Sequence, residues 1–261
     1  MNMTTRSLAV VTGASSGIGY QLALCCAREG FDLVIAADQP LDQATADCRA
    51  HGVDVEALQV ELASRQGIEE LCAVIGGRPI GALLANAGHG LGHAFLEQDF
   101  GAIQHVIDTN ITGTLYLLHR LIPRMREQGG GRVLITGSIA GFMPGSYQAV
   151  YNASKAFVDS FAAALRNELK GTGVTVTCLM PGATDTEFFA RADMLDTKVA
   201  SDDKADPAEV ARMGFKAMMD GEADVVTGLK NKLQVIMSKV APSQVVAAQH
   251  RRIAEPGTAK R

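Results

Sequence analysis

The chain has 261 residues, of which 47% are hydrophobic and 20% are charged, and its formal net charge is −4. These values suit a globular protein with a sizeable apolar core, and they give no basic surface for nucleic acid or for an anionic membrane. The five cysteines follow no CxxC or Cys/His spacing, and no apolar run approaches the roughly 20 residues that span a bilayer. The first residues lack the apolar core of a signal peptide, so we expect a cytoplasmic protein.

Apolar stretches of strand length alternate with amphipathic stretches of helix length as far as Met180. The predicted strands are 8–12, 32–37, 55–62, 80–86, 131–138 and 174–180, and the predicted helices are 18–28, 41–50, 68–74, 100–127 and 151–170. Strict alternation predicts an α/β fold with one doubly wound parallel sheet and helices on both faces. Right-handed crossovers then bring the carboxyl ends of the strands to one edge, where ligands bind.

The regular alternation ends after Pro181. Residues 187–206 are interpreted as a mobile substrate loop, and a helix is expected after Asp206-Pro207. Residues 229–261 are interpreted as a helical C-terminal extension. One face of that extension is apolar and carries Leu233, Ile236, Met237 and Val240. This face is expected to pack on the edge of the sheet, with an oligomer contact or a substrate lid as alternatives.

A glycine-rich turn, TGASSGIG at residues 12–19, joins the first predicted strand to the first predicted helix. Gly13 permits a tight exit from the strand, while Gly17 and Gly19 let the backbone approach a pyrophosphate and let the helix pack closely. The N–H groups at the start of a helix favour a phosphate. In this strand–turn–helix setting, about 20 residues before an acidic residue, the turn predicts a dinucleotide site. The whole chain, 1–261, is expected to form one dinucleotide-binding and catalytic domain.

Asp38 is the acidic residue that follows the second predicted strand. Its carboxylate is suited to accept hydrogen bonds from the adenosine ribose hydroxyls and to repel a 2′-phosphate, so the sequence favours NAD over NADP. Ala37 occupies the preceding position, where an acid is the more usual mark of NAD. A surface aspartate in a turn is the alternative interpretation.

Tyr151 and Lys155 are spaced i, i+4 and therefore share a helical face. A free tyrosine has a pKa near 10, too high for efficient proton transfer at neutral pH, and a neighbouring ammonium is expected to lower that pKa. Ser138 ends the fifth predicted strand, where its hydroxyl can hold a substrate oxygen beside the tyrosine. Two side chains that merely neighbour each other on a helix are the alternative.

These segments together resemble the short-chain dehydrogenase/reductase family. The matching motifs are TGASSGIG, Asn86–Gly88, Asn110 within DTNITGT, Ser138, YNASK, and PGATDT at Pro181–Thr186. The resemblance implies a Rossmann-type fold and an oxidoreductase that transfers a hydride between NAD or NADP and a carbonyl or alcohol carbon.

The resemblance also implies roles for individual residues. Tyr151 would be the general acid in reduction and the base in oxidation, with Lys155 on the nicotinamide ribose, Ser138 on the substrate carbonyl and Asn110 holding a relay water. The implied cofactor contacts are Gly13, Ser15, Ser16, Gly17, Ile18, Gly19, Asp38, Glu61, Leu62, Asn86, Ala87, Gly88, Tyr151, Lys155, Pro181, Gly182, Thr184 and Thr186.

The chain departs from the family pattern at three places. Glu61 stands where an aspartate is usual at the adenine amide, and ANAG replaces the usual NNAG, leaving Asn86 as the single asparagine. The usual final strand and GG ending are expected to be absent, replaced by the helical extension. That replacement weakens the implication of a homotetramer, and a homodimer through the two long helices is the other expectation.

The substrate is expected to be a hydrophobic carbonyl or alcohol because the predicted pocket walls are mostly apolar. These walls are Ile139, Phe142, Met143, Tyr147, Phe188 and Phe189. His89 and His93 have the spacing of a helical metal pair, but the glycines around them argue against a helix, so no metal is expected. A non-catalytic dinucleotide-binding regulator is the rival interpretation of the chain.

Overall fold

The computed structural model describes residues 6–259, and they form a parallel sheet with the strand order β3-β2-β1-β4-β5-β6-β7. The strands are β1 (Leu8–Thr12), β2 (Asp32–Ala37), β3 (Val55–Gln59), β4 (Ile80–Ala85), β5 (Gly131–Thr136), β6 (Val174–Met180) and β7 (Asp224–Val226). The strand order reverses between β1 and β4, which creates a crevice at their carboxyl ends. The predicted α/β, Rossmann-type doubly wound fold is confirmed.

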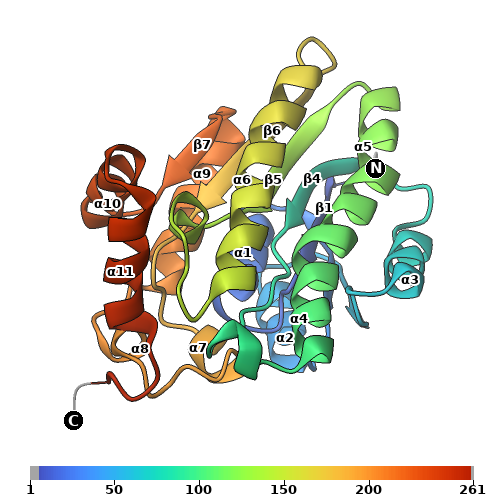
Figure 1. The fold of residues 1–261 in the computed structure, drawn as a ribbon. Coiled ribbons are helices and arrows are strands. Elements are labelled where there is room, and N and C mark those ends of the chain that lie inside the picture. Colours follow the sequence, from blue (N-terminus) through green and yellow to red (C-terminus); the bar gives the residue numbers. More distant parts are fainter. Residues whose placement is uncertain (1–5, 260–261) are drawn as a thin grey trace, which may run out of the picture.

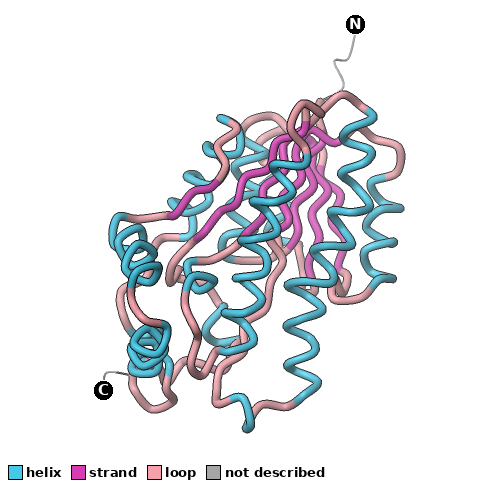
Figure 2. The backbone as a smooth tube through the Cα atoms, turned by 45° about the horizontal axis from the view of Figure 1, so that its top comes forward, coloured by secondary structure: helices cyan, strands magenta, loops and turns pink. Residues whose placement is uncertain are grey.

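Helices cover both faces of this sheet (Figures 1 and 2). They are α1 (Gly17–Arg28), α2 (Asp42–Arg49), α3 (Arg65–Ile75), α4 (Phe100–Ile107), α5 (Thr114–Glu127), α6 (Ala149–Glu168), α7 (Phe188–Arg191), α8 (Lys198–Ser201), α9 (Pro207–Asp220), α10 (Leu229–Val240) and α11 (Ser243–Ala254). In Figure 1, α4, α5 and α6 lie in front of the sheet, and α1 and α9 lie behind it.

Neighbouring residues of each inner strand contribute to opposite cores. Val10 and Val34 pack with α3, α5 and α6, whereas Val11 and Ile35 pack with α1, α2 and α9. Because side chains alternate between the two faces and both faces are covered, the inner strands direct apolar side chains to both faces. That double coverage explains why the sequence shows continuous apolar runs.

The predicted helix 100–127 is interrupted by a π-helical segment, η2 (Asp108–Gly113), between α4 and α5. Gly113 contacts the turn after β3 so closely that a Cβ there would lie 2.2 Å from the carbonyl oxygen of Leu62. π-Helical turns are often found at functional sites. The segment places Asn110 under the loop that follows β4.

The expectation that the final strand is absent is wrong. β7 pairs in parallel with β6, with Leu179 beside Val225, and lies at one end of the sheet. Its three residues are too few to show a strand pattern in the sequence.

The C-terminal extension forms two helices rather than one. Pro242 separates α10 from α11, because a proline inside a helix lacks the N–H donor that a continuous helix needs. The two helices lie together near the β7 end of the sheet, outside the layers that cover its faces (Figures 1 and 2). The predicted extension reaches residue 261, and its last two positions lie outside the described residues.

The expectation that the apolar face of the extension packs on the sheet edge is also wrong. Leu233 and Val240 are 62% and 75% exposed. Val235 is the buried hydrophobic residue of α10. The face is therefore directed away from the sheet.

Residues 187–206 contain the short helices α7 and α8 instead of an irregular loop. Phe189, Met194 and Ala200 are buried together in a small cluster that also includes Ala254 of α11. The mobility of this segment stays a prediction. No helix within residues 6–259 has the length and apolar character needed to cross a membrane.

Candidate active site

The glycine-rich turn after β1 fits tightly against two later segments. A Cβ on Gly13 would lie 2.9 Å from Ala87 Cα, and a Cβ on Gly17 would lie 2.8 Å from the Thr186 methyl carbon. Both glycines also have positive φ angles, 67° and 56°. The turn therefore contacts two later segments, Asn86–Gly88 and Pro181–Thr186. At the points of contact the turn has glycines, because a Cβ would not fit there.

The start of α1 is suited to bind an anion. Ser16 is the N-cap residue, and its side chain makes no capping hydrogen bond to the helix. Amide groups in the first turn of a helix lack intrahelical acceptors and carry partial positive charge. A phosphate is the kind of group that such a helix start accommodates.

Asn86 joins three neighbouring strand ends. Its side-chain amide donates to the carbonyl oxygen of Thr12 at 3.1 Å, and its Oδ1 accepts from the Thr136 hydroxyl at 3.0 Å. Its backbone N–H donates to the Thr12 hydroxyl oxygen at 3.0 Å. One asparagine therefore fixes the carboxyl ends of β1, β4 and β5, and the departure from NNAG does not remove this connection.

Asp38 directly follows β2 and forms an ion pair with Arg191 of α7. The closest distance between a guanidinium nitrogen and the carboxylate is 3.6 Å, and Glu187 lies at the same distance from the other nitrogen of Arg191. The sequence did not single out Arg191. The negative charge of Asp38 is therefore partly compensated by Arg191, which belongs to the segment after Thr186.

Glu61 forms a hydrogen bond within its own segment. Its Oε1 accepts a hydrogen bond from the backbone N–H of Ala63 at 2.8 Å, within the turn that precedes α3.

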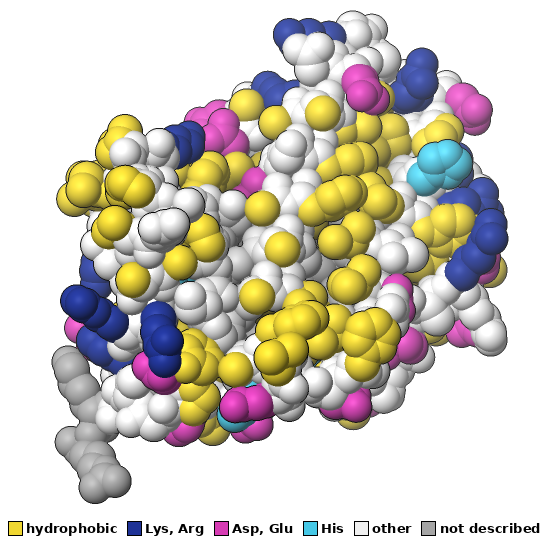
Figure 3. Space-filling view, viewed as in Figure 1, with side chains coloured by type: hydrophobic (Ala, Val, Ile, Leu, Met, Phe, Trp, Pro, Cys, Tyr) yellow, Lys and Arg dark blue, Asp and Glu magenta, His cyan; other side chains and the backbone are white. Residues whose placement is uncertain are grey.

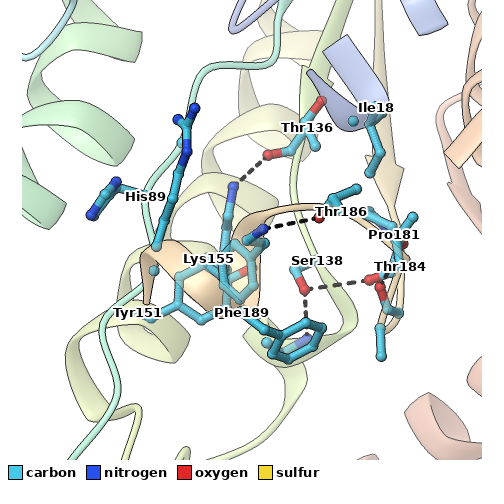
Figure 4. Close-up of a pocket in the computed structure, with 18 of the residues that line it drawn as sticks. Ile18, His89, Thr136, Ser138, Tyr151, Lys155, Pro181, Thr184, Thr186 and Phe189 are labelled. Atoms are coloured by element: carbon cyan, nitrogen blue, oxygen red, sulfur yellow. Dashed lines mark hydrogen bonds between the residues drawn. The ribbon is translucent and has the colours of Figure 1, made fainter. Parts of the chain in front are cut away.

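Ser138 holds the segment between β5 and α6 against the end of β6. Its hydroxyl donates to the carbonyl oxygen of Pro181 at 3.3 Å and accepts from the N–H of Ala140 at 3.1 Å (Figure 4). The Ser138 hydroxyl also acts on Tyr151, whose pKa it lowers as a hydrogen-bonding neighbour. The serine and the tyrosine therefore face the same small region of the site.

Lys155 is buried beneath Tyr151. Its ammonium donates to the carbonyl oxygen of Thr136 at 2.8 Å and lies 5.9 Å from the centre of the tyrosine ring (Figure 4). Phe188 packs on the tyrosine with a centroid separation of 5.0 Å. The helical spacing seen in the sequence thus brings the two groups to one face, as expected.

The pKa of Tyr151 is shifted in the opposite direction to the one expected. Burial raises its pKa to about 12, although the hydrogen bond with Ser138 opposes that rise. Burial also lowers the pKa of Lys155. The apolar surroundings disfavour both the phenolate and the ammonium, and this effect outweighs the proximity of the two groups.

Asp159 is a buried carboxylate one helical turn after Lys155. Its Oδ1 accepts from the backbone N–H of Ser138 at 3.3 Å and from the Cys178 thiol at 3.6 Å, whereas its Oδ2 has no hydrogen-bond partner. Burial raises the pKa of Asp159 to about 6, and the Lys155 ammonium partly opposes that rise. The Asp159 carboxylate therefore contacts the backbone of Ser138 and also favours the charged form of Lys155.

Asn110 does not line the cavity but forms hydrogen bonds with His89, which does, and with Ser154. Its Oδ1 accepts from the backbone N–H of His89 at 2.7 Å, and its Nδ2 donates to the carbonyl oxygen of His89 at 2.9 Å and to Ser154 Oγ at 2.9 Å. A Cβ on Gly88 would lie 3.4 Å from both Asn110 Oδ1 and Lys155 Nζ. The π-helical segment therefore brings the asparagine close to the lysine.

The C-terminal extension holds the loop before α6. His250 Nδ1 lies 2.9 Å from the carbonyl oxygen of Ser146, and the Tyr147 hydroxyl donates to Glu255 at 2.6 Å. Burial lowers the pKa of His250. Tyr147 adopts a positive φ of 63°, and its hydroxyl reaches the extension through the bond to Glu255.

A cavity of about 610 Å³ unites these segments. Every predicted catalytic and cofactor-binding residue except Asn110 lines it. Residues that the sequence did not indicate also line it, among them His105, Thr109, Gln148, Arg191, Lys230, Asn231, Gln234, His250 and Ile253. The extension supplies five of these nine residues, and no motif in the sequence marks them.

Four of the six predicted pocket walls line the cavity, namely Ile139, Met143, Phe188 and Phe189. The predictions for Phe142 and Tyr147 are wrong. Phe142 packs against the core and under Lys239, whose ammonium lies 5.0 Å from the ring centre. Tyr147 contacts Glu255 instead.

His89 and His93 do not point to a common site. His89 packs edge-on against His105, with ring centres 4.9 Å apart, whereas His93 pairs with Asp193 at 2.8 Å. Within residues 6–259 no three His, Cys, Asp or Glu side chains are grouped as metal ligands. His89 lines the cavity.

Comparison with known proteins agrees with this geometry. Residues 7–194 match the family model for short chain dehydrogenases. An uncharacterized oxidoreductase of Myxococcus xanthus is 35% identical over 257 residues, covering 94% of this chain and 96% of the relative.

Two solved structures are similar in sequence and fold. A short-chain dehydrogenase from Sphingobium yanoikuyae in complex with NADPH is 30% identical, with a TM-score of 0.80 and coverage of 91% of this chain and 98% of the other. The bulky-bulky ketone specific alcohol dehydrogenase from Comamonas testosteroni is 28% identical, with a TM-score of 0.76 and coverage of 92% and 97%. The chain therefore belongs to the short-chain dehydrogenase/reductase family and is an NAD(P)-binding oxidoreductase.

Proposed function

We propose that the protein transfers a hydride between a nicotinamide cofactor and the carbonyl or alcohol carbon of a bulky, hydrophobic substrate. The observation that carries the proposal is the convergence of Ser138, Tyr151 and Lys155 in one cavity with the glycine-rich turn. A proton-transfer group, its neighbouring cation and an anion-binding helix start are the elements that this chemistry needs from a protein.

The residues present fit a dinucleotide. The backbone around Gly13 and Gly17 forms a cradle that a Cβ would fill, beside the uncapped start of α1. The turn would hold the pyrophosphate, Asp38 the adenosine ribose, Lys155 the nicotinamide ribose, and Pro181–Thr186 the carboxamide. When bound, the nicotinamide supplies or accepts the hydride.

Tyr151 is suited to act as the acid in carbonyl reduction. With a pKa raised to about 12, its hydroxyl is protonated at neutral pH and can donate to the substrate oxygen. Ser138 would orient that oxygen. In oxidation the hydroxyl must first lose its proton, a step that Lys155 favours only when its ammonium stays charged.

The substrate end of the cavity favours apolar groups. Ile139, Met143, Phe188 and Phe189 line it, and Val199 and Ile253 add further apolar surface. We therefore propose ketones and secondary alcohols with two bulky substituents, a class similar to the one named for the Comamonas testosteroni enzyme. NAD is the proposed cofactor because of Asp38. A cytoplasmic homodimer or homotetramer stays a prediction.

The decisive experiment compares Tyr151→Phe with a matched control, Tyr116→Phe, which lies outside the cavity. Reduced-nicotinamide absorbance is followed across a panel of ketones and alcohols with each cofactor. We expect Tyr151→Phe to lower kcat/KM by about 100-fold or more, while the Kd for NADH changes by less than about twofold.

Near-wild-type turnover in Tyr151→Phe would contradict the proposed mechanism. Tight cofactor binding by the wild type without turnover of any substrate class would instead support the non-catalytic regulator.

A further inference from the structure

Helix α10 has its apolar side turned outward. Leu229, Leu233, Ile236, Met237 and Val240 are between 56% and 85% exposed. At roughly 100° per residue, these five side chains fall within an arc of about 100° on the helix. The opposite side faces the protein and includes Asn231 and Gln234, which line the cavity. We call the five exposed residues the α10 stripe.

Figure 3 shows hydrophobic side chains gathered over α10 at the upper left of the molecule. A helix in a globular protein normally directs its apolar side to the core and its polar side to solvent. Because α10 does the reverse, its stripe is not explained by the packing of this chain.

Lysines flank the α10 stripe on both edges. Lys232 and Lys239 lie on one edge and Lys230 lies on the other, and all three are exposed. Residues 225–254 contain five Lys and Arg but no Asp or Glu, whereas the rest of the chain has 19 Lys and Arg against 28 Asp and Glu. The surface around the stripe is therefore basic on an otherwise acidic protein.

We propose that α10 lies on an anionic lipid surface, with the stripe at the boundary of the acyl chains and the lysines on the lipid phosphates. An apolar stripe bordered by lysines is the pattern of helices that lie in the plane of a membrane interface. Each basic residue near an anionic leaflet adds to the binding. The expectation of no membrane partner came from the overall charge, which averages out this local basic surface.

A second copy of the chain fits the α10 stripe less well. A twofold axis through α10 would place α10 against its own copy, with lysine edges facing lysine edges. The extension offers no carboxylate between residues 225 and 254 to compensate that repulsion. Anionic lipids supply both the negative charge and the apolar volume.

The test measures flotation of the full-length protein with vesicles of phosphatidylcholine alone and of phosphatidylcholine mixed with phosphatidylglycerol. The stripe variant is Leu233→Gln with Ile236→Gln, and the basic variant is Lys232→Gln with Lys239→Gln. The matched control is Leu96→Gln, because Leu96 is 92% exposed but belongs to η1 (Phe95–Glu97), outside the extension. Circular dichroism confirms that each variant is folded.

We expect the wild type and the control to bind the anionic vesicles, and the stripe variant to bind at least about tenfold more weakly. The basic variant should lose about tenfold on anionic vesicles only, and added salt should weaken wild-type binding. Flotation needs no turnover, so its failure is distinct from a failure of the proposed reaction.

Three results would overturn the proposal. They are absence of wild-type binding to anionic vesicles, unchanged binding of the stripe variant, and an oligomer in sedimentation that the stripe variant dissociates. The last result would assign the stripe to a second copy.

Discussion

Replacing Asp159 with asparagine is expected to stabilise the folded protein at pH 8 while weakening catalysis. Burial raises the pKa of Asp159 to about 6, against 3.8 for a free aspartate. Because the folded-state pKa is higher, the folded protein favours the protonated form. The contribution of this group to stability is full below about pH 4 and is lost as the pH rises through about 6.

The size of the effect follows from the pKa difference of about two units. At about 1.4 kcal/mol per unit, ionisation of Asp159 costs roughly 3 kcal/mol at pH 8. Asparagine avoids that cost and keeps an oxygen for the Ser138 N–H. However, the asparagine NH₂ group would replace Oδ2, which is buried without a hydrogen-bond partner, and the unpaired N–H groups offset part of the gain. At about 2 °C per kcal/mol, we expect Tm to rise by about 3–6 °C at pH 8.

The assay is thermal unfolding of the wild type and Asp159→Asn between pH 4 and pH 8. Asp54→Asn is the control, since it removes a carboxylate that is exposed. The Tm difference for Asp159→Asn should shrink toward zero at pH 4. A Tm that falls at pH 8, or a difference of equal size at both pH values, would refute the reasoning.

The catalytic effect of Asp159→Asn has its own readout. Without the carboxylate, the pKa of Lys155 falls further, so the alkaline limb of the kcat/KM profile for alcohol oxidation should move to lower pH. Loss of packing alone would lower activity evenly across the pH range, which separates the two explanations.

Asp38→Arg is expected to shift the NADP/NAD ratio of kcat/KM by at least about tenfold toward NADP, because it places a second guanidinium beside Arg191; an unchanged ratio in steady-state assays would show that Asp38 does not face the ribose. Gly17→Ala should weaken NADH binding by about tenfold in fluorescence titration, because its Cβ would lie 2.8 Å from the Thr186 methyl carbon and its φ is positive; unaltered affinity would contradict the cradle. The kcat/KM for alcohol oxidation should rise about tenfold per pH unit below the pKa of Tyr151, because this direction needs the phenolate. The kcat/KM for ketone reduction should not change over the same pH range. Parallel pH profiles in the two directions would be inconsistent with Tyr151 as the proton-transfer group.

The parts of the site that the sequence predicted are those in which a backbone constraint selects a residue type. Gly13 and Gly17 have positive φ angles and contacts that exclude a Cβ, so the chain must have glycine there. Tyr151 and Lys155 share a face because a helix repeats every 3.6 residues. Such constraints are local, and they are visible without knowledge of the rest of the fold.

The parts that the sequence missed depend on contacts between distant segments. Arg191 reaches Asp38 across 153 positions, and His250 meets the loop at Ser146 across 104. The π-helical turn at Asn110 is fixed by its hydrogen bonds to His89, a residue outside the helix. Helical periodicity shows only the spacing of apolar residues. None of these contacts changes that spacing, so the sequence pattern does not reveal them.

The direction of the Tyr151 pKa shift is the clearest case of a property that spacing does not determine. The i, i+4 rule gives the neighbour but not the polarity of the surroundings. Phe188 packs on the phenol ring, and the Lys155 ammonium donates one hydrogen bond to the carbonyl oxygen of Thr136. Desolvation therefore exceeds the attraction between phenolate and ammonium, and the hydroxyl stays protonated. A hydroxyl that stays protonated across the neutral range can donate to a carbonyl oxygen, whereas alcohol oxidation requires that the same hydroxyl first lose its proton.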